Sequence, residues 1–361
     1  MLFRSSGAGQ DFVYGGSGND ALNALEAGID NGIGEDVYIG SGKDTLNTLE
    51  AGIANGDDLA WIEGTTGPDS LPGTSEPNLI LALAGNDTVN GFGGDDLIFG
   101  DVGNSLIPDA GAAGNDLLYG GAGLDSIYGG SGNDTLNAEG PGVDRLFGEI
   151  GNDVYIVYTT ADILVENPNQ GIDIVRSSAS YTLDANVENL LLTGTASVNG
   201  TGNNLNNQIR GNSRNNTLNG GGGNDTLNGG GGNDILTGGL GSNQFLFNTA
   251  VARANVDRIT DFHIRSNDKI LLDKSVFSAL DTRPRNVLLA TDFAVINVAP
   301  RAEVVAAGNS MDEIVYNRRT GNLFYNPNND ASGFGRGGGR FATITFAGSN
   351  NLSNTHFGVV A

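Results

Sequence analysis

Residues 120–137 constrain the fold more than any other stretch, because they contain one nine-residue unit twice, GGAGLDSIY and GGSGNDTLN. Both copies follow the pattern Gly-Gly-x-Gly-x-Asp-x-Φ-x, in which Φ is apolar; Asp125 and Asp134 stand in the sixth position, and Ile127 and Leu136 in the eighth. The residues after each aspartate have the pattern of a short strand with one side chain pointing inward. A loop and a short strand that alternate in this way predict a parallel β-solenoid.

The glycines and the aspartate of the unit have separate roles. Glycine reaches backbone conformations closed to other residues, so the loop can turn until several carbonyl oxygens converge. The aspartate adds a carboxylate to those carbonyls, and oxygen-only ligation of this kind suits calcium, which accepts irregular cages of about six to eight oxygens. The glycines of the four best-preserved units are therefore candidate calcium-site residues: Gly120, Gly121, Gly123, Gly129, Gly130, Gly132, Gly220, Gly221, Gly223, Gly229, Gly230 and Gly232.

The unit recurs in one phase along much of the chain. From Gly64 the sixth position is occupied in turn by Asp69, Asn78, Asp87, Asp96, Ser105, Asp116, Asp125, Asp134, Asp144 and Asp153. The spacing is nine residues, except for eleven between Ser105 and Asp116 and ten between Asp134 and Asp144. With the units near the amino end and those at 220–237, the candidate calcium carboxylates are Asp20, Asp44, Asp69, Asp87, Asp96, Asp116, Asp125, Asp134, Asp144, Asp153, Asp225 and Asp234.

Changes in the repeat divide the chain into five segments. They are irregular repeats at 1–63, which also show a period of 24 residues (NALEAGIDNG, then NTLEAGIANG), a main β-roll at 64–156, a bridging β segment at 157–199, a second β-roll at 200–247, and a C-terminal β cap at 248–361. In the cap, we expect strands within 257–277 and 340–348, and a hairpin of 314–316 with 323–325.

Composition and charge restrict the partners. The chain has 361 residues, 58 glycines, no cysteine and a net charge of −24, so a thiolate metal site, a disulfide framework and a cysteine nucleophile are excluded. Residues 1–249 contain 6 basic and 32 acidic residues, whereas residues 250–361 contain 12 and 10. The acidity therefore belongs to the repeats, which favours cations and disfavours nucleic acid. The sequence has no run of about 18 apolar residues, so we expect no membrane span.

The unit resembles the nonapeptide of repeat-in-toxin (RTX), haemolysin-type calcium-binding proteins. The likeness extends to the bridge around Val187-Glu188-Asn189-Leu190, and the tail from Asp257 is similar to the C-terminal cap of serralysin-like members. It implies an all-β, right-handed parallel β-roll with two repeats per coil, several calcium ions bound between loops, and secretion by type I machinery that reads a C-terminal signal. The amino end lacks the apolar stretch of a signal peptide, which agrees with such a route.

Two repeats per coil place sixth-position residues about eighteen apart next to each other. We therefore expect the pairs Asp69–Asp87, Asn78–Asp96, Asp87–Ser105, Asp96–Asp116, Asp116–Asp134, Asp125–Asp144 and Asp134–Asp153, and in the second roll Asn216–Asp234 and Asp225–Asn243. Because the second roll has one carboxylate in each pair, we expect the strongest calcium binding in the 116–153 stretch.

No motif indicates an enzyme. The chain has two histidines, His263 and His356, with no His-Glu-x-x-His and no Gly-x-Ser-x-Gly, and calcium already accounts for the regular aspartates. We therefore expect a secreted calcium-binding repeat protein that folds on extracellular calcium. Two alternatives remain open: a calcium-dependent adhesive protein of the cell surface, with polysaccharide as a partner, and a carbohydrate-active solenoid.

Overall fold

The computed structural model describes residues 12–17, 21–23, 37–41, 45–47, 60–101, 114–280, 288–328, 333–334, 338–348 and 351–360. The chain divides into two compact units, one of residues 1–58 with 104–109, and one of residues 59–103 with 110–361. In the first unit, β1 (Phe12–Ser17) pairs in parallel with β3 (Val37–Ser41), and β2 (Ala21–Asn23) with β4 (Thr45–Asn47). Ala21 pairs with Thr45, which matches the 24-residue period of the sequence. Asp20 and Asp44 lie outside the described residues.

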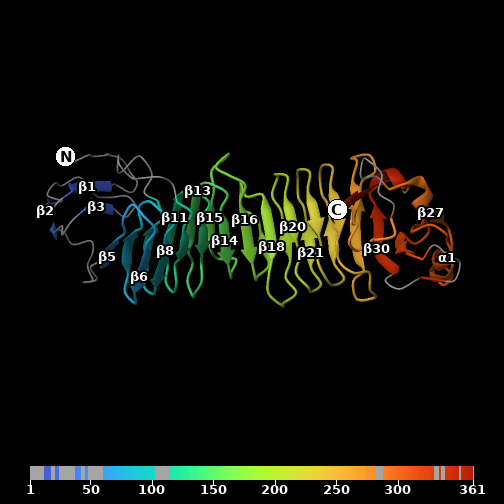
Figure 1. Ribbon diagram of the computed structural model, residues 1–361, viewed down its shortest axis with the longest axis horizontal. Coiled ribbons are helices and arrows are strands. Elements are labelled where there is room, and N and C mark those ends of the chain that lie inside the picture. The colour runs from blue at the N-terminus through green and yellow to red at the C-terminus, as the bar shows by residue number, and fades with distance from the viewer. Residues whose placement is uncertain are drawn as a thin grey trace. The chain divides into compact units, whose positions relative to one another are not determined.

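The second unit is a parallel β-solenoid, and its longest sheet has twelve strands (Figure 1). Every pair of neighbours in this sheet is parallel. In chain order the strands are β6 (Ser70–Thr74), β8 (Thr88–Phe92), β10 (Leu117–Tyr119), β12 (Thr135–Asn137), β14 (Val154–Val157), β16 (Ile174–Ser177), β18 (Asn189–Leu192), β20 (Gln208–Arg210), β22 (Thr226–Asn228), β24 (Gln244–Phe247), β26 (Lys269–Asp273) and β31 (Phe357–Val360).

The intervening strands form two further sheets. One contains β5 (Ala60–Glu63), β7 (Asn78–Leu81), β9 (Leu97–Phe99), β11 (Ser126–Ser131), β13 (Arg145–Ile150) and β15 (Ile163–Val165). The other contains β17 (Tyr181–Thr182), β19 (Gly200–Thr201), β21 (Thr217–Asn219), β23 (Ile235–Thr237), β25 (Asp257–Phe262), β27 (Phe293–Ile296), β28 (Ile314–Asn317), β29 (Asn322–Tyr325) and β30 (Gly339–Phe346). One face of the solenoid is therefore continuous, whereas the opposite face is interrupted between β15 and β17.

The eighth residue of each repeat builds the core. Leu118 pairs in register with Val89 on one side and with Leu136 on the other, and all three are fully buried. The corresponding side chains along the twelve-stranded sheet join one apolar cluster that continues into the cap through Phe245 and Phe262. Each coil buries few apolar atoms, so the stack depends on neighbouring coils, as in other repeat proteins. The all-β parallel roll predicted from the sequence is confirmed.

Two predicted pairings in the main roll, Asp87–Ser105 and Asp96–Asp116, are wrong. Ser105 does not follow Asp87 in the stack, because β8 pairs directly with β10 and β9 pairs directly with β11. Asp87 therefore faces Asp116, and Asp96 faces Asp125; each pair is 29 residues apart. The unit around Ser105 belongs to a segment, 102–113, outside the described residues. The eleven-residue spacing after Ser105 is the sequence signal of this interruption.

The bridge contributes coils of the solenoid. Tyr155 in β14 pairs with Val175 in β16, which in turn pairs with Leu190 in β18, and Leu190 pairs with Ile209 in the second roll. The twelve-stranded sheet thus runs through 157–199 without a gap. The change in sequence at the bridge alters the loops and leaves the core ladder intact.

The cap contains the mixed part of the third sheet. β25 pairs with β30 in parallel, and β28, β29 and β30 form antiparallel pairs, so the predicted hairpin with Ile314 opposite Tyr325 is confirmed. A short helix, α1 (Glu303–Gly308), and two 3-10 turns, η1 (Ala290–Asp292) and η2 (Asn354–His356), complete it. No helix among the described residues has the length and apolar character needed to span a membrane.

Candidate metal centre

The sixth-position carboxylates lie inside the loops of the second unit. They are at most 2% exposed at Asp87, Asp96, Asp116, Asp125, Asp134, Asp144, Asp153, Asp225 and Asp234. Asp69, in the outermost described coil of the main roll, is partly exposed. A charged side chain is rarely buried without a partner of opposite charge or a bound metal, so each of these groups requires an explanation.

One oxygen of each carboxylate links consecutive coils. The backbone N–H of Asp116 donates to Asp134 Oδ1 at 2.8 Å, and the N–H of Asp134 donates to Asp153 Oδ1 at 2.7 Å. The same bond joins Asp69 to Asp87, Asn78 to Asp96, Asp125 to Asp144, Asn216 to Asp234, and Asp225 to Asn243. The structure thus brings these pairs together as the two-repeat coil predicts.

The second oxygen is left over. Oδ2 is buried and has no hydrogen-bond partner in eight of the sixth-position aspartates: Asp87, Asp96, Asp116, Asp125, Asp134, Asp153, Asp225 and Asp234. A buried acceptor without a partner costs about 1–3 kcal/mol, and more if it is charged. The same unpaired oxygen recurs in coil after coil, so each of these loops offers an anionic oxygen donor that fits a cation.

The first glycine of each unit keeps space open beside that oxygen. A Cβ on Gly129 would lie 2.5 Å from Asp134 Oδ2 and 2.8 Å from the carbonyl oxygen of Gly148 in the next coil. A Cβ on Gly120 would lie 2.5 Å from Asp125 Oδ2. Gly220 and Gly229 repeat the arrangement with Asp225 Oδ2 and Asp234 Oδ2, respectively. At Gly129, therefore, a carboxylate oxygen and a carbonyl oxygen converge on one small space, which is the donor set that calcium prefers.

The other two glycines of each unit have a conformational role. The glycine in the second position of the unit has a φ of +98° at Gly121, and the glycine in the fourth position has a φ of +138° at Gly132. Residues with a Cβ rarely adopt this region. The same region is occupied by Gly123, Gly130, Gly221, Gly223, Gly230 and Gly232. The three glycines of the motif thus give the loop its turns and its open space.

Burial raises the pKa of these carboxyl groups. The pKa of Asp134 is raised to about 8, chiefly by desolvation and further by the charges of Asp153, Asp116 and Asp101, although its hydrogen bond from the Asp116 N–H opposes the shift. Desolvation likewise raises the pKa of Asp96 and of Asp116 to about 7. Like charges within a buried loop are unfavourable unless a cation or a proton compensates them.

Asparagine at the sixth position is uncharged, so its loop needs no cation to compensate a buried charge. Asn216 Nδ2 donates to the carbonyl oxygen of Val198 at 2.5 Å. Asn78 Nδ2 donates to Thr74 Oγ1 and to the carbonyl oxygen of Glu76. The amide thus donates to oxygens of the loop, which a carboxylate cannot do.

Sequence reasoning missed five sixth-position acids that lie outside well-preserved units. Asp162, Asp173 and Glu188 continue the ladder through the bridge, and Asp257 and Asp268 continue it into the cap. Each precedes an apolar residue by two positions, as in Asp173-Ile174-Val175. This Asp-x-Φ half of the motif was the available signal. Asp234 faces Asp257, so this pair has two carboxylates, whereas the sequence predicted one carboxylate in each pair of the second roll.

A second ladder was also missed. Asparagine in the fifth position accepts a hydrogen bond from the following coil: the N–H of Asn133 donates to Asn115 Oδ1, and the N–H of Asn152 donates to Asn133 Oδ1. The sixth-position ladder accepts from the preceding coil. Each loop is therefore held from both sides.

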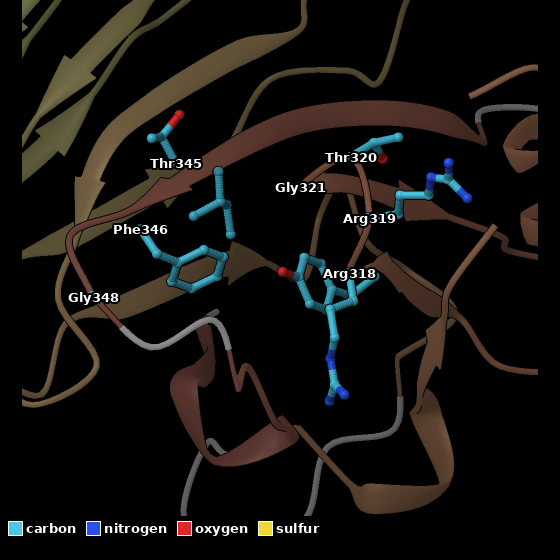
Figure 2. Close-up of a pocket in the computed structure, with 9 residues that line it drawn as sticks. Arg318, Arg319, Thr320, Gly321, Thr345, Phe346 and Gly348 are labelled. Carbon is cyan, nitrogen blue, oxygen red and sulfur yellow. The ribbon is translucent and has the colours of Figure 1, made fainter. Parts of the chain in front are cut away.

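A surface pocket in the cap has a different character (Figure 2). Its lining includes Arg318 and Arg319 at the turn of the β28–β29 hairpin, with Thr320, Thr345 and Phe346. None of the described residues that line it is an aspartate, a glutamate or a histidine, so this pocket lacks the carboxylates that build the acidic loops.

Comparison with known families agrees with this geometry. The family model of the RTX calcium-binding nonapeptide repeat, in four copies, matches residues 5–26, 72–107, 110–136, 125–155 and 201–245. No curated protein sequence gives a significant match. The similarity of the cap to serralysin-like proteins stays a prediction. The repeated motif, its match to the family model and the β-solenoid together identify the chain as an RTX-type repeat protein with calcium-binding nonapeptides.

Proposed function

We propose that this protein is a secreted module whose nonapeptide loops bind several calcium ions and whose main roll completes its fold on calcium outside the cell. The observation that carries the proposal is the row of buried Oδ2 atoms without a hydrogen-bond partner. Extracellular calcium modules have dissociation constants of about 10⁻⁴–10⁻³ M, so such loops would fill outside the cell and stay empty in a low-calcium cytosol.

The residues that would hold each ion come from neighbouring coils. Between the coils of Asp134 and Asp153, for example, Asp134 Oδ2 and the carbonyl oxygen of Gly148 already converge beside Gly129. Calcium would supply the positive charge that these oxygens lack. The protein contributes the glycine-dependent loop shape and the N–H donors that orient each carboxylate.

A calcium titration tests the proposal. The full chain, purified in excess chelator, should show reduced β content by circular dichroism, and calcium at millimolar concentration should restore it. Magnesium at the same concentration is the control, because it demands a smaller, regular octahedral site and should restore little. Full β content in chelator, unchanged by calcium, would refute calcium-dependent folding.

Export is part of the same proposal. Proteins with RTX repeats are typically secreted, and we assign the export signal to the region 248–361 by its similarity to the serralysin-like cap. The test is fusion of residues 248–361 to a reporter in a strain that carries a type I transporter. Transport of the reporter is the expected result; retention of the fusion alongside export of a known substrate would contradict it.

We also propose that the chain acts without catalysis of its own. The regular aspartates are engaged in the loop ladders, and His356 Nδ1 interacts with Ser353 in the 3-10 turn η2, where burial lowers the pKa of the imidazole. Assay of the calcium-loaded protein against acidic polysaccharides tests this. Depolymerisation that is abolished by substitution of a loop aspartate would favour the carbohydrate-active alternative.

A further inference from the structure

The first coil of the bridge has an acidic side chain where the preceding coils of the same sheet have glycine or, at Ala82, alanine. The β13–β15 register pairs Phe147 with Val165, so Gly148 and Glu166 follow at equivalent positions. The loop from Glu166 to the sixth-position residue Asp173 is two residues longer than that from Gly148 to Asp153. The extra length gives room for a long side chain at the place where the preceding loops of this sheet have glycine or alanine.

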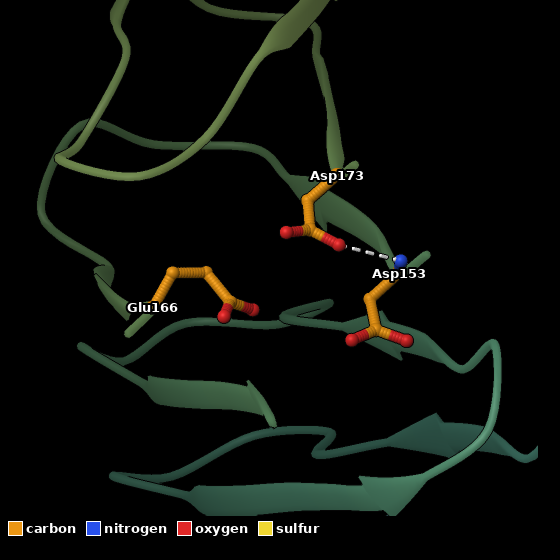
Figure 3. A group of neighbouring side chains, drawn as sticks. All are labelled: Asp153, Glu166 and Asp173. Atoms are coloured by element: carbon orange, nitrogen blue, oxygen red, sulfur yellow. Dashed lines mark hydrogen bonds between the residues drawn. The ribbon is translucent and has the colours of Figure 1, made fainter. Parts of the chain in front are cut away.

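The Glu166 side chain occupies the inside of this loop. Figure 3 shows its carboxylate directed towards those of Asp153 and Asp173. One oxygen from each of the three groups lies within 4.8 Å of the other two. Glu166 is only 6% exposed, Asp153 0% and Asp173 1%. Three carboxylates are thus gathered in a space that water scarcely reaches.

The hydrogen bonds of the cluster leave two oxygens unused. Asp173 Oδ1 accepts the Asp153 N–H at 2.8 Å, the bond drawn in Figure 3, and Glu166 Oε1 accepts the hydroxyl of Tyr155. Asp153 Oδ1 accepts the N–H of Asp134. In contrast, Asp153 Oδ2 and Glu166 Oε2 are buried and have no hydrogen-bond partner.

Oxygens of the cluster converge on a common space beside Gly148. A Cβ on Gly148 would lie 2.6 Å from Glu166 Oε1, and the Tyr155 hydroxyl and Asp153 Oδ2 would be closer still. The neighbouring charges that act on the three carboxyl groups are acidic: they come from the cluster itself, from Glu149 and from Glu188. The protein thus assembles oxygen donors here, and none of the charges that act on them from the described residues is positive.

We propose that Asp153, Glu166 and Asp173 form a further calcium site, supported by the Tyr155 hydroxyl, at the junction of the main roll and the bridge. Glu166 and Asp173 lie outside the residues that match the nonapeptide model. The site has three carboxylates, whereas a nonapeptide pair has two, and a higher charge count raises calcium affinity. The inference rests on the proposed function only in that Asp153 also belongs to the last nonapeptide of the main roll.

The test counts bound calcium by equilibrium dialysis of the full chain. Glu166→Gln keeps the size and hydrogen-bonding capacity of the side chain and removes its charge, so repulsion in the metal-free fold is reduced and the variant should fold. It should bind one ion fewer than the wild type, or bind it more weakly. Glu139→Gln, which changes an exposed loop residue, is the matched control and should leave the count unchanged.

A second variant keeps all three carboxylates. Tyr155→Phe removes only the hydroxyl that orients Glu166, and loss of such a supporting group costs about 10–100-fold in metal affinity. Terbium luminescence excited through tyrosine should also fall in this variant, because Tyr155 is next to the site. A loss of emission with an unchanged Glu139→Gln control supports the site.

The outcomes separate the two proposals. If the wild type binds no calcium, the proposed function fails. If the wild type binds calcium and both Glu166→Gln and Tyr155→Phe bind the same number of ions with the same affinities, the further site is refuted.

Discussion

The main roll and the second roll share a fold and differ in the side chain that faces the loop. In the main roll, Asp116, Asp134 and Asp153 follow one another in consecutive coils, and each leaves a buried Oδ2 without a partner. In the second roll, Asn207 and Asn216 alternate with Asp225 and Asp234 in their ladders, and each asparagine amide donates to carbonyl oxygens of the preceding coil.

This difference separates two requirements that the motif combines. Both residues have an Oδ1 that accepts the N–H of the neighbouring coil, so both maintain the ladder. Only aspartate requires a positive charge in addition. From this comparison we expect coils with asparagine to stack without calcium and coils rich in aspartate to need it. We therefore expect the second roll to depend less on calcium than the main roll does.

The largest single effect is expected for Asp134→Ala. The change removes a carboxylate from the pairs with Asp116 and Asp153, so two calcium sites should weaken together. It also leaves the buried N–H of Asp116 without its acceptor, which costs about 1–3 kcal/mol on its own. The measurement is calcium dialysis together with the free energy of unfolding in saturating calcium.

The counterpart in the second roll is Asp225→Ala, which removes a carboxylate that faces asparagine on both sides. It should lose less calcium binding than Asp134→Ala. Equal loss of calcium from both variants would break the comparison between the rolls.

A glycine pair gives the next largest effect. Gly129→Ala places a methyl group 2.5 Å from Asp134 Oδ2, and overpacking of this kind costs about 1–3 kcal/mol. Gly231→Ala is the control, because its nearest neighbour would be 3.5 Å away and its φ is not in the left-handed region. Thermal unfolding in calcium should show a clear loss of stability for the first variant only. Similar losses for both would mean that the first glycine has no special role.

Exchange of the two side chains should transfer the calcium requirement. Asn216→Asp replaces the amide that donates to Val198 with an oxygen, so the variant should lose about 1–3 kcal/mol of stability in chelator and regain it in calcium. Asp134→Asn should do the reverse and stabilise the metal-free main roll. Urea unfolding with and without calcium measures both. A calcium-independent change in Asn216→Asp would contradict the account.

Protons should substitute for calcium in part, which is the smallest effect because a proton does not bind the loop carbonyls. Burial raises the pKa of Asp134 from 3.8 to about 8 and that of Asp96 to about 7, so the metal-free folded chain binds protons that the unfolded chain releases. This stabilisation is complete below the unfolded pKa and is lost as the pH rises through about 7–8.

Circular dichroism in chelator should therefore show more β content as the pH is lowered from about 8 towards 5. With calcium present the trend reverses, because protons compete with the ion. A metal-free chain that steadily loses β content over this acidification would show that the carboxylates are not repelling one another.

The sequence predicted what depends on regular spacing. The eighth-position ladder of Val89, Leu118 and Leu136 follows from a nine-residue period, because a solenoid places equivalent residues in register. The paired carboxylates followed from the same period. Which coil follows which across an interruption could not be deduced: the spacing after Ser105 signals a break, and only the strand pairing shows that the chain skips a whole unit.

The remaining misses share a physical reason. Asp173 and Asp257 occupy sixth positions in loops that lack the full glycine pattern, so a search for complete units passes over them. Their role depends on the backbone N–H of the preceding coil, which the fold brings close. Glu166 was missed because its position corresponds to the first glycine, and only a loop lengthened by two residues can accommodate it.

Hydrogen exchange of the full chain, with and without calcium, tests whether the main roll depends on calcium more than the second roll does. Peptides from 114–157 and from 200–247 report the two rolls in one experiment. We predict that removal of calcium abolishes amide protection in 114–157 and reduces it much less in 200–247. Equal loss of protection in both rolls, or full protection of 114–157 in chelator, would contradict it.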